Sequence, residues 1–375
     1  MRLMQVVPLY DSYRVFLREL TWALEAEGHA VRTLCRIGEG NTIDYDPADT
    51  TCRHFPLPRG QHPLRHLRTA RALREEIDDF RPDVVHAHFS AAILTAALAR
   101  SRDMAGIRFM GTFQGLQFPV TRGMRGRFLR GGECWAASHM DAVWVLTDDD
   151  AEALQRHAPR AEVVKQESCG FGCHDRFFDT PFPDSGERAS RRREAGLDPE
   201  AVVLIFIGRL VAHKGFHLAA RAFMQAHERR PELRWLVIGE RDSLHPTGLT
   251  ESEWAAFSQH PSIQWLRTQN DVLPWLDLAD AVLFPTSREG MPVSVMEALA
   301  RRVPVLTNRV RGCRELVDNG VNGHFFPESS VDAIREVLDS FTPFRAPAPP
   351  ARLRRSNWIA EMRRAYAGSE SDTSK

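Results

Sequence analysis

The chain has 375 residues, which is too long for one compact core and suits two medium-sized domains. Its apolar fraction of 43% and charged fraction of 26% are typical of a soluble globular protein. The formal net charge of zero gives no reason to expect a nucleic-acid partner, and no apolar run suits a signal peptide or a membrane span. We therefore expect a cytoplasmic protein.

In the first half, short apolar runs alternate with stretches of helical periodicity. Residues 12–27 and 66–80 space their apolar side chains for one face of a helix. The runs expected to form strands are residues 3–7, 30–35, 84–87, 107–111, 142–146 and 162–165. Strands that alternate with helices predict a parallel sheet covered by helices on both faces.

The second half repeats this α/β architecture without repeating the residues, with strands expected at 202–207, 233–238, 263–266, 281–284 and 303–306. The pattern pauses between them, where prolines and a glycine precede the basic run 191–193. We interpret residues 1–175 as one doubly wound domain, 176–200 as a linker region and 201–345 as a second doubly wound domain. A proline-rich break precedes a last helix near 352–368. Ligands of such sheets bind outside the carboxyl ends of the strands, so we expect both sheets to direct these ends to one cleft.

The strongest motif is PTSREGMPVSVMEALA at residues 285–300, which joins an apolar strand to an amphipathic helix. Glu289 lies in the loop before the helix, where Gly290 lets the backbone approach a ligand and Pro292 suits the first helical turn. The helix N-terminus is then a natural seat for a phosphate or a sugar hydroxyl. Glu297 stands among apolar residues inside the helix, so its carboxylate needs a partner, and ligand hydroxyls would serve. A solvated loop acid at 289 and a helix-surface charge at 297 are the structural alternative.

The second motif is FIGRLVAHKG at residues 206–215, again a strand followed by a glycine turn and a helix. Gly208 makes the turn, and Arg209 and Lys214 are two cations that would suit a diphosphate at the strand end. A pair of solvated surface cations is the alternative, and the motif alone leaves both interpretations open.

Together these motifs resemble glycosyltransferase family 4, a group of retaining enzymes with the two-domain GT-B fold. Glu289 and Glu297, with seven residues between them, resemble the paired-glutamate signature of the family, and residues 208–215 resemble its phosphate motif. The stretch RGCRELVDNGVNG at 311–323 is similar to members that build bacterial surface polysaccharides. The resemblance is dense from residue 206 to 327 and patchy before residue 169.

The resemblance implies a role for each matching residue. Arg209 and Lys214 would bind the diphosphate of a UDP-type or GDP-type sugar donor and stabilise it as it leaves. Glu297 would hold the ribose hydroxyls and Glu289 would contact the transferred sugar. The N–H groups around Gly290, Met291 and Pro292 would complete that pocket. Two cations and a helix terminus need no metal, so we expect neither a metal nor a cofactor.

The first half matches the family less closely. Residues 82–88, PDVVHAH, resemble its fourth-strand motif, in which His86 and His88 would have structural or substrate-pocket roles. The two side chains point to the same face of a strand, and metal ligation is the alternative. Residues 111–115, GTFQG, fall where the family often carries histidine before glycine, so Gln114 and Gly115 are expected on the acceptor side. Gln114 can bond a sugar but cannot shuttle a proton. The loop after the first strand, residues 8–14, lacks the family's glycines.

Three further features receive mainly structural interpretations. The run Asp148–Asp150 follows Thr147 directly after a strand, so helix capping explains it better than metal binding. Cys169 and Cys173 are a loose fit to zinc spacing and lack a second ligand pair. Residues 121–130 carry four arginines interleaved with apolar side chains. They suit a solvated helix face, and a peripheral contact with the anionic inner face of the cell membrane is the second interpretation.

We therefore expect a retaining, metal-independent glycosyltransferase. It would use a nucleotide diphosphate-sugar donor and a glycan or lipid-linked sugar acceptor in polysaccharide or glycolipid synthesis. A non-catalytic GT-B protein that binds nucleotide-sugar or glycan is the main alternative, favoured by Gln114 and the glycine-free first loop. A GT-B phosphorylase or nucleotide-sugar epimerase is a further alternative.

Overall fold

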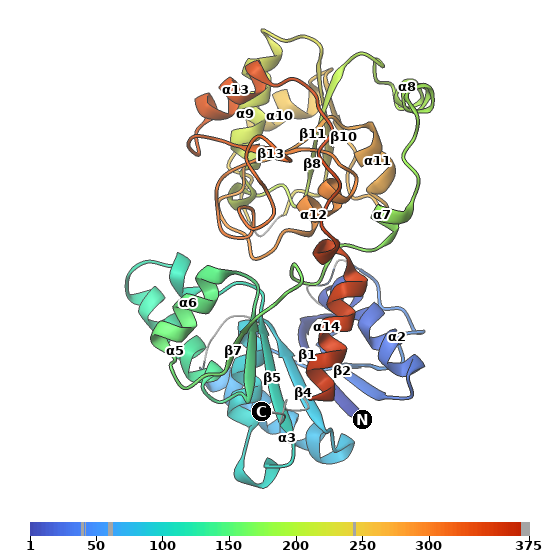
Figure 1. The fold of residues 1–375 in the computed structure, drawn as a ribbon. Helices are drawn as coiled ribbons and strands as arrows, with labels where there is room; N and C mark the ends of the chain where they lie inside the picture. Colours follow the sequence, from blue (N-terminus) through green and yellow to red (C-terminus); the bar gives the residue numbers. More distant parts are fainter. Residues whose placement is uncertain (39–40, 42, 59–62, 243–244, 369–375) are drawn as a thin grey trace, which may run out of the picture. The chain divides into compact units, whose positions relative to one another are not determined.

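The computed structural model describes residues 1–38, 41, 43–58, 63–242 and 245–368. The chain divides into two compact units. Unit 1 comprises Met1–Phe171 and Asn357–Lys375, and unit 2 comprises Gly172–Ser356. Each unit is built on its own parallel sheet (Figure 1).

Unit 1 contains a seven-stranded parallel sheet in the order β3-β2-β1-β4-β5-β6-β7. Its strands are β1 (Arg2–Leu9), β2 (Ala30–Arg36), β3 (Cys52–His54), β4 (Val84–His88), β5 (Arg108–Phe113), β6 (Ala142–Val145) and β7 (Val163–Lys165). Its helices are α1 (Tyr10–Ser12), a π-helical turn (Tyr13–Leu17), α2 (Arg18–Ala26), α3 (Pro63–Phe80), α4 (Phe89–Ala99), α5 (Gly123–Ala137), α6 (Asp148–His157) and α14 (Arg355–Ala367). Short 3-10 turns lie at Arg102–Met104 and Phe118–Val120.

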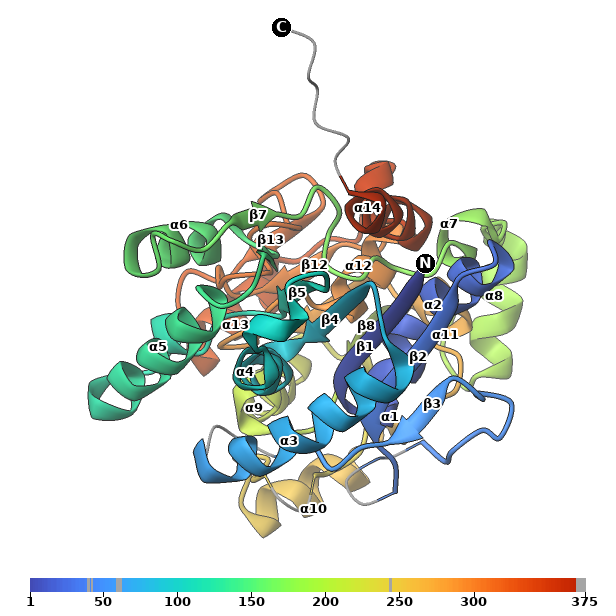
Figure 2. The same ribbon diagram turned by 90° about the horizontal axis from the view of Figure 1, so that it is seen from below.

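Two hydrophobic clusters cover the two faces of this sheet. One joins α3, α4, α5 and α6 to the sheet, and α4 lies between α3 and α5 (Figure 2). The other is formed by α1, α2 and α14, with Trp358, Met362 and Tyr366 of α14 buried against the sheet. The last helix is therefore part of the core of unit 1.

Unit 2 contains a six-stranded parallel sheet in the order β10-β9-β8-β11-β12-β13. Its strands are β8 (Val202–Ile207), β9 (Leu233–Ile238), β10 (Ile263–Trp265), β11 (Ala281–Phe284), β12 (Val305–Thr307) and β13 (Gly323–Phe325). Its helices are α7 (Arg176–Asp179), α8 (Ser185–Glu194), α9 (Phe216–His227), α10 (Glu251–Gln259), α11 (Leu273–Leu278), α12 (Val293–Ala300) and α13 (Val331–Ser340), with 3-10 turns at Ala212–Lys214 and Ala351–Leu353. Helices α9, α10 and α13 lie on one side of the sheet and α8, α11 and α12 on the other (Figure 1).

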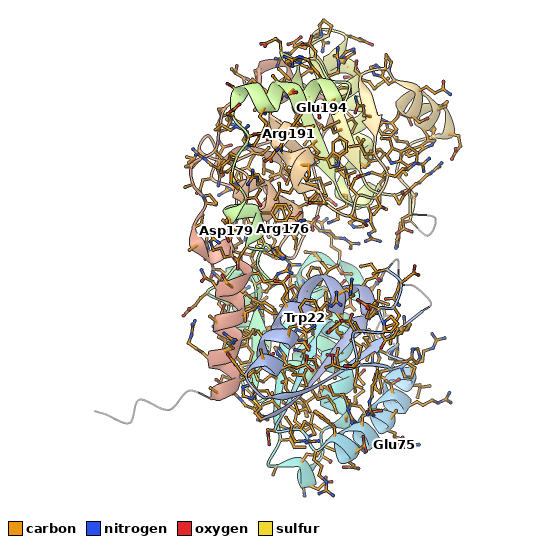
Figure 3. All side chains as sticks on the ribbon, turned by 90° about the vertical axis from the view of Figure 1, so that its right-hand side faces the viewer. Trp22, Glu75, Arg176, Asp179, Arg191 and Glu194 are labelled. Carbon is orange, nitrogen blue, oxygen red and sulfur yellow. The ribbon has the colours of Figure 1, made fainter. Side chains whose placement is uncertain are left out.

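The segment from 176 to 200 is anchored to unit 2 by buried arginines. Arg192 of α8 donates hydrogen bonds to Asp280 and to the carbonyl oxygens of Leu278 and Ala201. Arg301, which is fully buried, bonds Asp277 at 2.7 Å and the carbonyl of Thr180. The neighbouring polar residues of α8, Arg191 and Glu194, are labelled in Figure 3 with Arg176 and Asp179 of α7. Guanidinium groups bonded to backbone carbonyls therefore hold the basic run against the second sheet.

The predicted fold class is confirmed, because both halves are doubly wound and parallel. Each predicted strand is present, and the expected helices at 66–80 and 354–366 correspond to α3 and α14. The pattern missed β3 and β13, which are three residues long and lie at sheet edges, where few apolar side chains are needed. The expected helix at 12–27 is divided by the π-helical turn.

Candidate functional site

The candidate donor residues lie at the carboxyl ends of β8 and β11. These two strands are neighbours in the sheet, and the chain turns in opposite directions from them, so they flank the topological switch point. Gly208 and Arg209 follow β8, and Glu289 follows β11. Gly215 joins the two loops closely: its φ is 73°, and an added Cβ would lie 1.9 Å from the Pro285 carbonyl oxygen. Because Gly215 has no side chain, the loop after β8 packs directly against the start of the loop after β11.

Lys214 and Glu289, which are 75 residues apart, form an ion pair. The Lys214 ammonium Nζ donates to both carboxylate oxygens of Glu289, at 2.7 and 2.9 Å. Thr286 donates its hydroxyl to the same carboxylate at 2.8 Å. The carboxylate of Glu289 is nearly buried, with 9% of the side chain exposed, while Lys214 keeps 20%. The fold thus places a cation and an anion in direct contact at the site.

Arg209 points to a different partner. Its Nη1 donates to Asp242 Oδ2 at 2.8 Å, and 54% of its side chain remains exposed. The two cations that we expected to share a diphosphate therefore each form an ion pair with a different carboxylate.

Glu297 lies within α12 and is half-buried. Burial raises the pKa of its carboxyl to about 7, although the charges of Arg355 and Arg176 partly oppose that shift. Among the described residues, no side chain or backbone group donates a hydrogen bond to this carboxyl group. A carboxyl group in this environment can accept hydroxyl groups from a ligand.

The N-terminus of α12 is uncapped by any side chain, because Pro292 occupies the N-cap position. Gly290 and Met291 lead into this turn with partial exposure. The following loop packs tightly against it: Gly312 has a φ of 81°, and an added Cβ would lie 2.3 Å from the Gly290 carbonyl oxygen. The first N–H groups of the helix are therefore held in place and remain available to a ligand.

In unit 1 the first connection contains no loop, because α1 begins at Tyr10 directly after β1. The Tyr10 hydroxyl donates to Asp49 at 2.6 Å and accepts from the N–H of Asp46 at 2.9 Å. Arg14 and Arg18 both bind these two aspartates. The space that a glycine-rich loop would leave for a ligand is thus occupied by a buried tyrosine and an ion-pair network.

The ends of β4 and β5 carry the other residues singled out in unit 1. His86 is fully buried, and its ring nitrogens bond Tyr366 at 2.7 Å and Thr112 at 2.8 Å. Both ring nitrogens of the neighbouring His88 are buried without a hydrogen-bond partner in the described chain. Burial lowers the pKa of His88 to about 3, so the ring is neutral. His86 therefore holds α14 to the sheet, while His88 retains unused polar atoms.

Gln114 and Gly115 follow β5 at this same edge. The Gln114 amide nitrogen is buried and lacks a hydrogen-bond partner among the residues described. Gly115 adopts a φ of 103°, which turns the chain sharply after Gln114. The turn leaves one unused hydrogen-bond donor, the Gln114 amide, at the end of the strand.

The features given structural interpretations are explained by local contacts. Thr147 caps α6 by accepting from the N–H of Asp150, with Asp148, Asp149 and Asp150 in the first turn, so the capping interpretation is confirmed. Within the described ranges, no group of three or more His, Cys, Asp or Glu side chains could hold a metal ion, and Cys169 and Cys173 are buried and form no disulfide.

Sequence reasoning missed two polar groups at the carboxyl edge of the second sheet, Thr286 and Asp242. Asp242 and Lys214 find partners more than 30 residues away, so spacing along the chain carries no signal for them. Thr286 stands three residues before Glu289 in the same motif, and its position could have indicated the contact.

Comparison with family models matches each half of the chain to a different description. Residues 13–166 match the model described as glycosyl transferase 4-like domain. Residues 201–341 match the model described as glycosyl transferases group 1. The first match covers β2 to β7 of unit 1, and the second covers β8 to β13 of unit 2.

Relatives with similar sequences are named glycosyltransferases. The chain is 26% identical over 274 residues to putative glycosyltransferase EpsD of Bacillus subtilis (strain 168), which covers 72% of this chain and 70% of that protein. It is 23% identical to the capsular polysaccharide biosynthesis glycosyltransferase CapM of Staphylococcus aureus, over 59% of each. The crystal structure of HepE from Anabaena in complex with UDP and glucose has a TM-score of 0.69 at 14% identity, covering 91% of this chain and 89% of that one. At this identity the structural likeness shows the fold.

Proposed function

Because the chain belongs to the glycosyltransferases with the GT-B fold, as its resemblance to glycosyltransferase family 4 predicts, we propose that it transfers a sugar from a nucleotide diphosphate-sugar to a hydroxyl acceptor with retention. The observation that carries this proposal is the contact of Lys214 and Glu289 between two adjacent strand ends. This contact supports the proposal because a cation suited to a leaving diphosphate lies directly beside a carboxylate suited to bind sugar hydroxyls.

In this proposal the donor lies along the carboxyl edge of the second sheet. Glu297 accepts the ribose hydroxyls, Arg209 leaves Asp242 to bind the diphosphate, and Lys214 neutralises the charge that develops as it departs. Glu289 and the N–H groups at the start of α12 hold the transferred sugar. Side chains therefore supply the positive charge, and we propose that transfer needs no metal.

The proposed chemical step exchanges one bond at the anomeric carbon for another. The bond to the diphosphate oxygen breaks, and the acceptor oxygen forms its bond on the same face of the sugar. A departing phosphate oxygen takes the acceptor's proton. This route needs no basic side chain on the acceptor side, which suits Gln114, a residue that can donate a hydrogen bond but cannot accept a proton at neutral pH.

The donor class follows from the same groups, and we propose a UDP-type or GDP-type sugar. Similar solved structures of HepE contain UDP or UDP-glucose, which supports a UDP-sugar over a GDP-sugar as the donor. The acceptor proposed is a glycan or a lipid-linked sugar of bacterial polysaccharide or glycolipid synthesis, since relatives such as CapM carry that role in their names.

A peripheral contact with an anionic membrane is part of the proposal. No helix in the described chain is long and apolar enough to cross a bilayer. The outer face of α5 nevertheless exposes Met124 at 85% and Phe128 at 56%, four residues apart, and Trp135 lies further along this face. Its exposed arginines include Arg125 and Arg127, and the acid of this helix, Glu133, is buried. Apolar side chains flanked by arginines match the chemistry of an anionic lipid surface.

The decisive experiment is a donor screen followed by product analysis. Calorimetry with UDP, GDP and ADP should identify one tight-binding nucleotide, and its sugars should be turned over equally with and without EDTA. Nuclear magnetic resonance of the product should show the anomeric configuration of the donor. Inversion, or loss of turnover on chelation with recovery on Mn²⁺ or Mg²⁺, would contradict the mechanism.

The alternative is a non-catalytic protein that binds nucleotide-sugar or glycan. The connection between β1 and α1 favours this alternative. It contains the buried Tyr10 and no glycine turn that could bind a ligand. The same screen separates the two functions: a binding protein would take up nucleotide-sugar and release neither nucleotide nor transferred sugar.

A further inference from the structure

Two buried carboxylates accept hydrogen bonds from the backbone of the turn that follows Gln114. Glu133 of α5, which is 2% exposed, accepts the backbone N–H of Gln117 and the N–H of Phe118, each at 3.1 Å. Asp150 of α6, which is fully buried, accepts the N–H of Leu116 at 3.4 Å. Three consecutive backbone donors of this turn therefore point at carboxylates from two different helices.

Glu133 also reaches the neighbouring strand end. Ser90 lies in the first turn of α4, directly after β4, and donates its hydroxyl to Glu133 Oε1 at 2.6 Å. In the sheet, His88 at the end of β4 is paired in register with Thr112 of β5. One carboxylate thus joins the connection after β4, which His88 ends, to the connection after β5, which contains Gln114.

The Glu133 carboxylate is buried without a cationic partner among the described residues. No lysine or arginine within the described ranges forms an ion pair with Glu133, and burial together with the nearby Asp150 raises its pKa. A buried carboxylate without a cation is unfavourable unless several hydrogen bonds compensate it. Here the compensating donors are the Ser90 hydroxyl and two backbone N–H groups of a single turn, so the arrangement fixes the backbone after Gln114.

We propose that Glu133 is a positioning residue for sugar transfer. By bonding Ser90, Gln117 and Phe118 it fixes the turn at 114–118, so that the Gln114 amide is aimed at a hydroxyl of the acceptor or the transferred sugar. A fixed donor loses less freedom on binding than a mobile one, which increases its contribution to the bound complex. This inference rests on the proposed function, because it assigns the turn to the acceptor side.

The first test measures the turn without reference to activity. Glu133→Gln keeps the side-chain size but turns an amide NH₂ toward backbone donors. Amide exchange followed by mass spectrometry should show at least tenfold faster exchange in peptides that cover residues 114–120, with the second sheet unchanged. The matched control is Glu152→Gln on α6, whose side chain is exposed. Unchanged exchange at 114–120 in Glu133→Gln would overturn the proposal.

The second test separates positioning from general damage. The enzyme's preferred donor, taken from a panel of UDP- and GDP-sugars, is supplied with and without a p-nitrophenyl hexoside as acceptor. Glu133→Gln should lower transfer to the hexoside about tenfold while hydrolysis of the donor and nucleotide affinity change less than twofold. The effect should be absent when Gln114 is already alanine. Equal losses in transfer and hydrolysis, or losses that add to Gln114→Ala, would show a purely structural role.

A milder variant covers poor folding of Glu133→Gln. Ser90→Ala removes one of the three hydrogen-bond donors to Glu133 and should produce the same pattern at about a third of the size. If the wild type transfers no sugar at all, the proposed function has failed, whereas the exchange experiment still decides whether Glu133 fixes the turn.

Discussion

The carboxyl edges of the two sheets use charge in opposite ways. In unit 2 the ion pairs Lys214–Glu289 and Arg209–Asp242 are partly exposed, so a ligand can replace one partner. In unit 1 the carboxylates near this edge bind groups of the protein itself. Asp49 is buried against Tyr10, Arg14 and Arg18, and Glu133 accepts backbone N–H groups. The comparison indicates that one edge is suited to an anionic ligand, while the other offers neutral donors on a fixed backbone.

The largest effect expected from this comparison is at Lys214. Lys214→Met keeps the bulk of the side chain but removes the ammonium that would stabilise the departing diphosphate. We expect kcat/KM to fall by about two orders of magnitude or more, the scale seen when one preorganised transition-state donor is removed. Because Glu289 would lose its cation, the melting temperature must be measured alongside. A variant that folds and turns over like the wild type would remove Lys214 from the chemistry.

The two glutamates should respond differently. Glu289→Gln should leave nucleoside diphosphate binding nearly intact and reduce turnover by about tenfold to a hundredfold, since the sugar contact strengthens in the transition state. Glu297→Gln should weaken nucleotide and nucleotide-sugar alike by about tenfold, because both contain the ribose. Calorimetry and steady-state kinetics on both variants check this contrast. If both bind and turn over normally, the assignment of the pair is wrong.

Arg209 tests whether the exposed ion pair yields to a diphosphate. Arg209→Ala should weaken binding of the nucleoside diphosphate by about 2 kcal/mol, roughly thirtyfold in Kd, the scale of a lost charge-assisted contact. Arg241→Ala is the matched control, because Arg241 pairs with Glu251 on the surface. Equal effects of the two substitutions in calorimetry would mean that general surface charge explains the result.

The smallest effect concerns pH. The folded-state pKa of Glu297 is about 7, above its ordinary value, so the native state holds the proton between the two values. Its contribution to stability is therefore fully present below the unfolded pKa and is lost as the pH rises through 7. If ribose binds the ionised form, nucleotide affinity should fall by up to about tenfold from pH 8 to pH 6. Glu297→Gln should flatten this dependence; the same slope in both proteins would contradict the ribose role.

The sequence alone predicted the two-domain architecture and the candidate residues at the carboxyl edge of the sheet in unit 2. Apolar runs that alternate with amphipathic stretches predict two doubly wound domains because burial of apolar side chains follows the local period of strand and helix. Glu289 and Glu297 were placed correctly in a loop and a helix because strand, loop and helix are consecutive in the chain. Each of these features depends on residues close in sequence.

Tertiary structure alone decided which of these groups meet. Lys214 bonds Glu289 because neighbouring parallel strands end at the same edge and Gly215 permits close approach. Three further contacts also join segments that are distant in the sequence. Tyr10 bonds Asp49, His86 bonds Tyr366, and Glu133 bonds both Ser90 and the turn at 114–118. Their partners are chosen by strand order and packing, and neither leaves a periodic signal along the chain.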